Sequence, residues 1–337
     1  MTFPYVAQAS QHQQLEWLNG GTMQVLLAGE HTGGQLAMFR SFAPAGAASP
    51  AHVHSREDEI VMMLSGSATF WSGTHRFEVE EGGVAFLPRE VPHAYRITSD
   101  AEMLALSTPS GLEGFFRGAG HDRAEPKPEG WSITPETMGK AAAANGQTIL
   151  GPPLGPDGTL PVVSTGTQAV GTPYAAQPDE QEAVEWIGGR LIRIPLSGEH
   201  TGGQLTLFRS SARAGSASPV HVHSREDEIM LLLSGSGVFW VGGHRYELAA
   251  GGLCVVPRGV PMAYRLTSDA EIVTVTTPAG LESFFRRAGR DVRQPRPDGW
   301  ELTSDAIAAA SEATGQTILG PPLNLEDQTI PAELLKG

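Results

Sequence analysis

Two histidines separated by one residue are the first feature of this sequence that could support chemistry. His52 and His54 share one face if their segment is an extended strand, because side chains alternate along a strand. Glu59 follows after a polar loop, and His93 follows a later Gly-rich and apolar segment. Three neutral imidazoles and one carboxylate suit a first-row divalent ion. The pattern therefore predicts a metal site with one or two positions open for water or substrate.

A polar turn or a surface position would explain any one of these histidines taken alone. The complete set favours the metal, because two histidines share a strand face and the chain around them is patterned as a β-barrel. We expect one divalent transition metal here. Iron, nickel, manganese, cobalt and copper all accept these donors, zinc does as well, and the spacing does not choose among them.

An internal repeat organises the whole chain. The segment GEHTGGQL begins at Gly29 and returns at Gly198, and the segment HVHSREDEI begins at His52 and returns at His221. The offset is 169 residues in both cases. Similarity that keeps a constant register over this length indicates a duplicated domain.

The repeat and the composition together predict the domain boundaries. We expect an N-terminal domain over residues 1–154 and a C-terminal domain over residues 181–337. Residues 155–180 are rich in Gly, Pro, Thr and Ala, which is typical of a linker.

Within each copy, short β-branched and aromatic runs alternate with Gly and Pro, as at Glu59 to Ser65 and Ala68 to Trp71. Many short strands separated by turns indicate an all-β sandwich or barrel. Two stretches of the first copy are instead predicted to be helical, Leu112 to Arg117 and Pro135 to Ala144. The expected fold is mainly β with short peripheral helices.

The second copy repeats the first three candidate ligands as His221, His223 and Glu228, but Met262 stands where His93 stands. A thioether is a soft, weak ligand for a hard divalent ion. The C-terminal site is therefore either weak or empty, which we favour, or it is a two-histidine, one-carboxylate triad with an additional open position.

The spacing HxHxxxxE, followed by GxxxxxP and a later histidine, resembles the two motifs of the cupin superfamily. Here the first motif runs from His52 to Glu59, and the second runs from Gly82 through Pro88 to His93. The flanking residues resemble bacterial quercetin 2,3-dioxygenase-like cupins, once per copy. The resemblance implies two tandem cupin barrels of the double-stranded β-helix, or jelly-roll, type. The first copy departs from the usual pattern of the second motif at Glu90. A glycine is common at this position, and the second copy has Gly259 there.

The same resemblance implies a metal-dependent dioxygenase. Its substrate would be an aromatic or polyketide-like molecule with a hydroxyl beside a carbonyl, such as a flavonol, and O2 would be the second reactant. Glu59 would accept the hydroxyl proton in addition to binding the metal. Two alternatives remain open: a cupin isomerase, cyclase or lyase that uses the metal as a Lewis acid, and a cupin that only binds a small molecule.

Counting in twos along the expected strands predicts the wall of a substrate pocket. From Glu59 it places Val61 and Met63 on the inward face, and from His93 it places Tyr95 and Ile97 there. Phe115 and Phe116 are expected in core or dimer packing rather than against substrate.

Charge and composition limit the partners. The formal net charge is -14 without a basic block, which disfavours nucleic acid and anionic membrane surfaces. The start of the chain has no apolar signal segment, and we expect a cytoplasmic protein without a membrane partner. The single cysteine, Cys254, lies in an apolar run and is expected to be buried. The cupin resemblance implies a homodimer.

Overall fold

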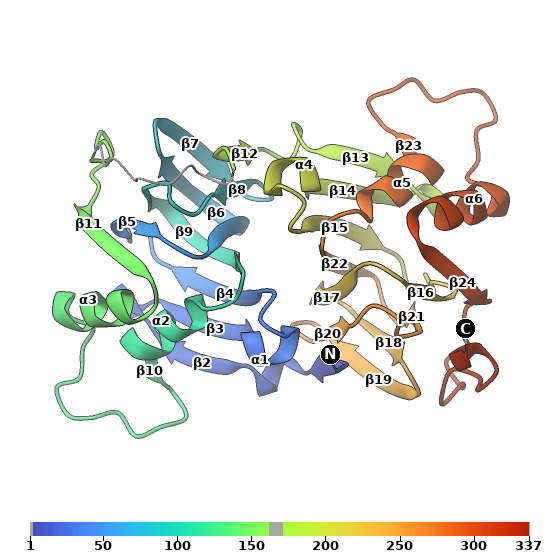
Figure 1. Cartoon of the computed structure of the whole chain (residues 1–337), viewed down its shortest axis with the longest axis horizontal. Coiled ribbons are helices and arrows are strands. Elements are labelled where there is room, and N and C mark those ends of the chain that lie inside the picture. The colour runs from blue at the N-terminus through green and yellow to red at the C-terminus, as the bar shows by residue number, and fades with distance from the viewer. Residues whose placement is uncertain (1–2, 162–170, 337) are drawn as a thin grey trace. The chain divides into compact units, whose positions relative to one another are not determined.

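The computed structural model describes residues 3–161 and 171–336, and these form two compact units (Figure 1). One unit comprises the described residues of 12–180, and the other comprises residues 3–11 together with 181–336. About 45% of the chain is strand and 16% is helix, which confirms the expected mainly β fold. In the described part of the chain, each helix is too short or too polar to serve as a membrane span.

The N-terminal unit is built on one 11-stranded antiparallel sheet. Its main path runs β10-β2-β3-β4-β9-β6-β8-β12, while β7 pairs with β6, and β5 pairs with β9 and β11. Its strands are β2 (Gln13–Glu16), β3 (Thr22–Leu27), β4 (Ala37–Ala43), β5 (Pro50–His54), β6 (Asp58–Ser72), β7 (His75–Glu80), β8 (Val84–Leu87), β9 (His93–Thr108), β10 (His121–Asp122), β11 (Gln147–Pro153) and β12 (Tyr174–Ala176). Its helices are α1 (Gly29–Thr32), α2 (Leu112–Ala119), α3 (Pro135–Ala144) and the 3-10 turn η2 (Leu18–Gly20).

The two longest strands, β6 and β9, pair along almost their whole length and bend at a bulge. The sequence predicted two strands where the structure has the single strand β6. Register shifts between Met63 and Ala68 bend it in the middle instead of ending it. Gly66 permits the bend, because its φ is 73° and a Cβ there would clash with the backbone of Asp100.

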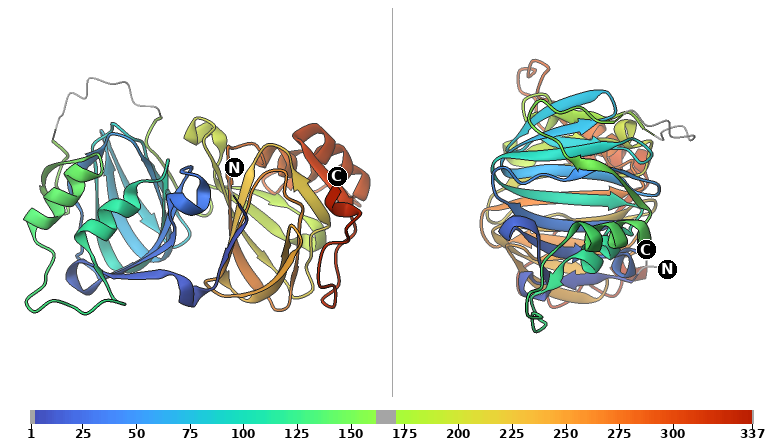
Figure 2. Two further views of the ribbon diagram at one scale, coloured as in Figure 1. Left: turned by 60° about the horizontal axis from the view of Figure 1, so that its bottom comes forward. Right: turned by 90° about the vertical axis from the view of Figure 1, so that its left-hand side faces the viewer.

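Two helices cover one side of the N-terminal core. Figure 2 shows α2 and α3, drawn in teal and green, side by side along the sheet. Phe115 and Phe116 of α2 pack edge-to-face against Trp17, with ring centroids 5.7 and 5.0 Å apart. Thr134 caps α3 by accepting a hydrogen bond from the backbone N of Thr137, as its position before Pro135 favours. Buried residues of both helices belong to the hydrophobic core of this unit.

The C-terminal unit repeats this arrangement with its hydrogen bonds divided between two sheets. The 8-stranded sheet has the order β1-β20-β17-β22-β15-β14-β13-β23, and the 5-stranded sheet has the order β19-β18-β21-β16-β24. Its strands are β1 (Tyr5–Ala7), β13 (Glu182–Glu185), β14 (Leu191–Leu196), β15 (Thr206–Ala212), β16 (Val220–His223), β17 (Asp227–Ser234), β18 (Ser236–Val241), β19 (His244–Ala249), β20 (Leu253–Val256), β21 (Met262–Leu266), β22 (Ala270–Thr277), β23 (Arg290–Asp291) and β24 (Gln316–Gly320). Its helices are α4 (Gly198–Thr201), α5 (Glu282–Ala288), α6 (Ser304–Thr314) and the 3-10 turns η1 (Ala9–Gln11), η3 (Ile187–Gly189) and η4 (Leu334–Lys336). In both units the strands form open sheets rather than closed barrels.

The first strand of each copy pairs with a strand of the other copy. Strand β1 pairs with β20 in the C-terminal unit, with Tyr5 opposite Val255. Strand β12 pairs with β8 in the N-terminal unit, with Tyr174 opposite Phe86. Strand β12 lies within the stretch 155–180 that the sequence predicts as linker, while residues 162–170 of that stretch lie outside the described residues. Both added strands cover an edge that would otherwise expose unpaired backbone groups.

Candidate metal centre

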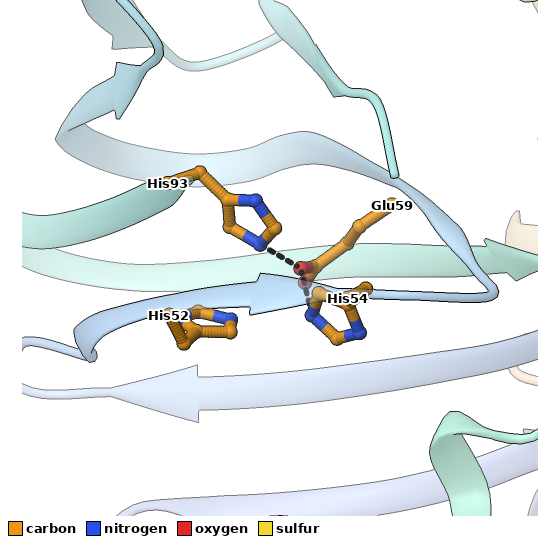
Figure 3. A group of neighbouring side chains, drawn as sticks. All are labelled: His52, His54, Glu59 and His93. Carbon is orange, nitrogen blue, oxygen red and sulfur yellow. Dashed lines mark ion pairs between the residues drawn. The ribbon is translucent and has the colours of Figure 1, made fainter. Parts of the chain in front are cut away.

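The four predicted ligands come together where three strands of the N-terminal unit meet. His52 and His54 are on β5, Glu59 is the second residue of β6, and His93 is the first residue of β9. The sheet register places His52 directly opposite His93. Figure 3 shows the four side chains converging on one point.

The distances between these side chains suit shared ligation of one ion. Their potential ligand atoms all lie within 4.8 Å of one another. Glu59 Oε2 lies 3.5 Å from His93 Nε2 and 3.7 Å from His54 Nε2. All four residues are buried, with 9% exposure or less. The cluster is thus shielded from bulk water on most sides.

Backbone contacts fix which imidazole nitrogen faces the cluster. His52 Nδ1 donates to the carbonyl of Pro50 at 2.9 Å, and His93 Nδ1 donates to the carbonyl of Val91 at 3.0 Å. A neutral imidazole then has its lone pair on Nε2, which is how metal-ligating histidines are usually oriented. His93 Nε2 and both ring nitrogens of His54 are buried without a hydrogen-bond partner. His54 Nδ1 lies 3.7 Å from the buried carboxylate of Glu57 and can carry the proton, which leaves Nε2 of both His54 and His93 as acceptors. A cation would satisfy these two acceptors, so the residues present fit a metal ion.

The protonation states also fit metal binding. Burial, together with the neighbouring His93, lowers the pKa of His52 well below its usual value and that of His54 to about 4. Burial raises the pKa of Glu59, but its contact with His93 and the other histidines outweighs burial and brings that pKa to about 2. Neutral imidazoles and an ionised carboxylate are the forms that bind a metal.

A partly buried ion pair connects the segments that carry Glu59 and His93. Asp58 precedes Glu59, and its Oδ1 accepts from Arg89 N at 2.7 Å and Nε at 2.9 Å, while Oδ2 accepts from Arg89 Nη2 at 2.8 Å. The next residue, Glu90, donates from its backbone N to the carbonyl of His54 at 2.8 Å. Glu90 adopts a φ of 64°, which explains why Gly is common at this position of the motif. This loop therefore sets the positions of three ligands at once.

A cavity of about 70 Å³ opens beside the cluster. Of the predicted pocket residues, Val61 and Tyr95 line it, but Met63 and Ile97 do not, and both are buried in the core instead. Those two lie four positions from Glu59 and His93, roughly 13 Å along a strand, and so beyond the cavity. The wall includes further residues that the pocket prediction omitted, most of them apolar or aromatic: Trp17, Leu18, Met23, Met103, Ala105, Leu112, Phe115, Phe116 and Met138.

Phe115 and Phe116 are the clearest omission from the predicted site. Both belong to the core, as expected, and both also line the cavity. Their place in the sequence, on a helix after the last strand of the repeat, does not show that this helix folds back over the cavity mouth. The wall they form is aromatic, which suits a planar organic molecule.

Each copy of the repeat matches a known protein family. The profile of the cupin domain family matches residues 38–109 and again residues 210–277. The chain contains two cupin domains. Among curated proteins, quercetin 2,3-dioxygenase of Bacillus subtilis (strain 168) is 31% identical over 143 residues, which cover 41% of this chain and 42% of that protein. The match therefore spans less than half of the length of this relative.

Solved bicupins share the fold across most of the chain. The oxalate decarboxylase of Lactobacillus farciminis, in complex with formate, superimposes with a TM-score of 0.58 at 12% identity and covers 83% of this chain and 87% of that chain. A Bacillus subtilis oxalate decarboxylase studied for its Mn(II) centres gives a TM-score of 0.58 at 16% identity, with 94% and 89% coverage. Similarity at this level of identity establishes a common fold.

The C-terminal cupin domain holds a reduced version of the same cluster. His221, His223 and Glu228 offer ligand atoms within 4.8 Å of one another, and His223 Nε2 lies 3.4 Å from Glu228 Oε2. Met262, fully buried, stands opposite His221 in the register where the N-terminal domain has His93. A thioether thus stands at the position that the fourth donor, His93, has in the N-terminal domain.

Proposed function

We propose that the N-terminal cupin domain binds one divalent transition-metal ion through His52, His54, Glu59 and His93. The observation that carries this proposal is the pair of buried Nε2 atoms of His54 and His93, which have no hydrogen-bond partner and face the carboxylate of Glu59. Iron, nickel, manganese, cobalt and copper are the candidates for a redox reaction, and zinc fits the same donors. The C-terminal triad, which lacks the third imidazole, is proposed to be weakly occupied or empty.

We further propose that this bicupin is a dioxygenase that cleaves an aromatic or polyketide-like substrate with a hydroxyl beside a carbonyl. The cavity supports an uncharged planar substrate, because its described lining includes aromatic side chains but neither Lys nor Arg. The sequence similarity to quercetin 2,3-dioxygenase supports a flavonol-like molecule.

Each group of residues has a distinct task in this reaction. Trp17, Phe115 and Phe116 bind the rings of the substrate and exclude water from the cluster. Glu59, the one carboxylate in the described cavity lining, accepts the proton of the substrate hydroxyl. When bound, the ion supplies positive charge that stabilises the deprotonated oxygen, together with a redox centre for the reaction with O2.

Metal content and oxygen consumption together test the proposal. We expect about one equivalent of a redox-active metal per chain in the wild type, purified without added metal or chelator, and its loss in His93→Ala. Oxygen uptake is expected with quercetin but not with luteolin, which lacks the hydroxyl beside the carbonyl. His221→Ala is the matched control in the C-terminal domain and should retain the uptake.

Four outcomes would contradict parts of this proposal. Wild-type protein purified without any bound metal would contradict the proposed metal centre. Zinc alone, or full metal loading without oxygen uptake across flavonols and related enols, would favour Lewis-acid chemistry instead. Equal metal content in the wild type and in His93→Ala would place the metal elsewhere.

A further inference from the structure

The C-terminal cavity has a cationic side chain in its wall, unlike the N-terminal cavity. Arg190 directly follows the turn η3 and lines this cavity. The equivalent residue of the first copy is Gly21, which follows η2 in a similar extended conformation, with φ of -68° against -61° for Arg190. A Cβ at Gly21 would lie 2.8 Å from the backbone oxygen of Phe42, so the N-terminal domain has no room for an arginine there.

The guanidinium of Arg190 is held by neutral partners only. Its Nη1 donates to the hydroxyl of Tyr264 at 2.9 Å, and its Nη2 donates to Ser210 Oγ at 2.5 Å. Its Nε is buried and has no hydrogen-bond partner. Within the described chain, no carboxylate lies within ion-pair distance of this guanidinium. A partly buried arginine whose charge is not paired is costly, and a bound anion would remove that cost.

The cavity around Arg190 is large and otherwise mostly apolar. Its volume is about 230 Å³, against about 70 Å³ for the cavity of the N-terminal domain. Trp186, Phe284 and Phe285 form an aromatic wall, and the triad with Glu228 also faces the cavity. This space can accept a small organic molecule with a charged end.

We propose that the C-terminal cavity binds a small organic monocarboxylate. The carboxylate accepts hydrogen bonds from the Nη N–H groups of Arg190 that Tyr264 and Ser210 leave unused, and its two oxygens match the planar end of the guanidinium. The body of the ligand lies against the aromatic wall. This wall favours an organic acid over inorganic phosphate, because phosphate would leave the apolar surface uncovered. Carboxylate binding in this cavity requires neither a metal nor a reaction in the N-terminal domain.

Calorimetric titration of the purified full-length chain with acetate, benzoate, octanoate and inorganic phosphate tests this site. We expect saturable binding of benzoate or octanoate at one site per chain. The affinity should fall by about tenfold or more in Arg190→Gln, which removes the charge, because hydrogen bonds to charged groups are among the strong ones. The affinity of Arg190→Lys, which retains the charge but not the planar fork, should lie between the affinities of the wild type and of Arg190→Gln.

Two control variants distinguish binding at Arg190 from binding elsewhere on the chain. Arg213→Gln removes the same charge from an exposed position outside the cavity and should bind as the wild type does. His93→Ala should lose metal from the N-terminal cluster and still bind the carboxylate. Equal affinity in wild type and Arg190→Gln, no saturable binding of any carboxylate, or binding of phosphate alone would each overturn the proposal. Circular dichroism identifies a variant that is unfolded. If Arg190→Gln is unfolded, the affinity of Arg190→Lys is compared with that of the wild type instead.

Discussion

His52 and His93 lie directly opposite each other on β5 and β9, and the corresponding pair in the second cupin domain is His221 and Met262. Both domains therefore have a side chain at the same point of the same strand pairing. In the N-terminal domain it offers an imidazole nitrogen, and in the C-terminal domain it offers a thioether sulfur. The other three donors of each cluster are identical in type. One side chain is thus the main difference between the two donor sets.

Met262→His is expected to create a second four-ligand site. An imidazole at this position would face His221 across the strands, as His93 faces His52, and would replace a weak thioether with a strong nitrogen donor. Elemental analysis should show metal rising from about one to about two equivalents per chain, while the control Met262→Leu stays at about one. A wild type that already holds two equivalents would show that the triad suffices without the fourth donor.

Glu59→Gln should slow oxygen uptake more than it lowers metal content. The amide keeps the size of the side chain, and three imidazoles remain to bind the ion, but the proton acceptor is lost. General-base catalysis typically contributes about 10²- to 10⁴-fold, so the uptake rate per bound metal should fall by about that factor. Glu228→Gln makes the same change in the C-terminal domain and should leave the rate unchanged. An undiminished rate per metal in Glu59→Gln would leave Glu59 as a ligand only.

The sequence alone was sufficient to predict that the N-terminal ligands lie close together. A spacing of two residues places His52 and His54 on one strand face, and the repeat shows which residues keep their spacing in both copies. The helix Pro135–Ala144 was also predicted with its observed limits, since Thr134 and Pro135 define its start. These features depend on local geometry, which a sequence pattern states directly.

Features that depend on long-range packing could not be predicted in this way. Counting in twos predicts the face of a strand but not the distance along it. Val61 and Tyr95 therefore line the cavity, while Met63 and Ile97 lie in the core farther along the strands. Strand β12 was hidden in a stretch of linker composition, because three residues that complete a sheet edge carry little pattern of their own. The interaction of Arg190 with Tyr264 joins residues 74 positions apart, and no motif marks it.

Ala105→Leu should weaken substrate binding without removing the metal. Ala105 lines the N-terminal cavity, so a larger side chain would fill part of its volume of about 70 Å³. One or a few methylene groups in a pocket alter binding by about 1–3 kcal/mol, so KM should rise by about tenfold or more. Thr274→Leu makes the matched change in the C-terminal cavity and should leave KM as it is. Metal content and thermal midpoint, measured for both variants, show whether either one perturbs the fold.

Cys254 should resist alkylation in the native protein. Burial raises the pKa of its thiol, because the low-polarity surroundings disfavour the thiolate, and the side chain is fully buried between β17 and β1. At about pH 8.5, where a free cysteine is half ionised, iodoacetamide should modify the protein only after denaturation. Mass spectrometry before and after adding guanidinium chloride measures this. Rapid labelling of folded protein would mean that the sheet around β20 opens readily.

Asp58→Asn is expected to weaken both the fold and the metal site of the N-terminal domain. The substitution leaves Arg89, whose side chain is 20% exposed, without its carboxylate. Breaking a fully buried ion pair typically costs about 3–5 kcal/mol, so a smaller loss is expected for this partly buried pair. Because the same pair joins the segments carrying Glu59 and His93, metal affinity should fall together with the thermal midpoint. Asp227→Asn breaks the equivalent pair with Arg258 in the C-terminal domain. It should lower stability and leave N-terminal metal affinity unchanged, whereas equal metal loss in both variants would show that the pair acts through global stability and not by positioning the ligands.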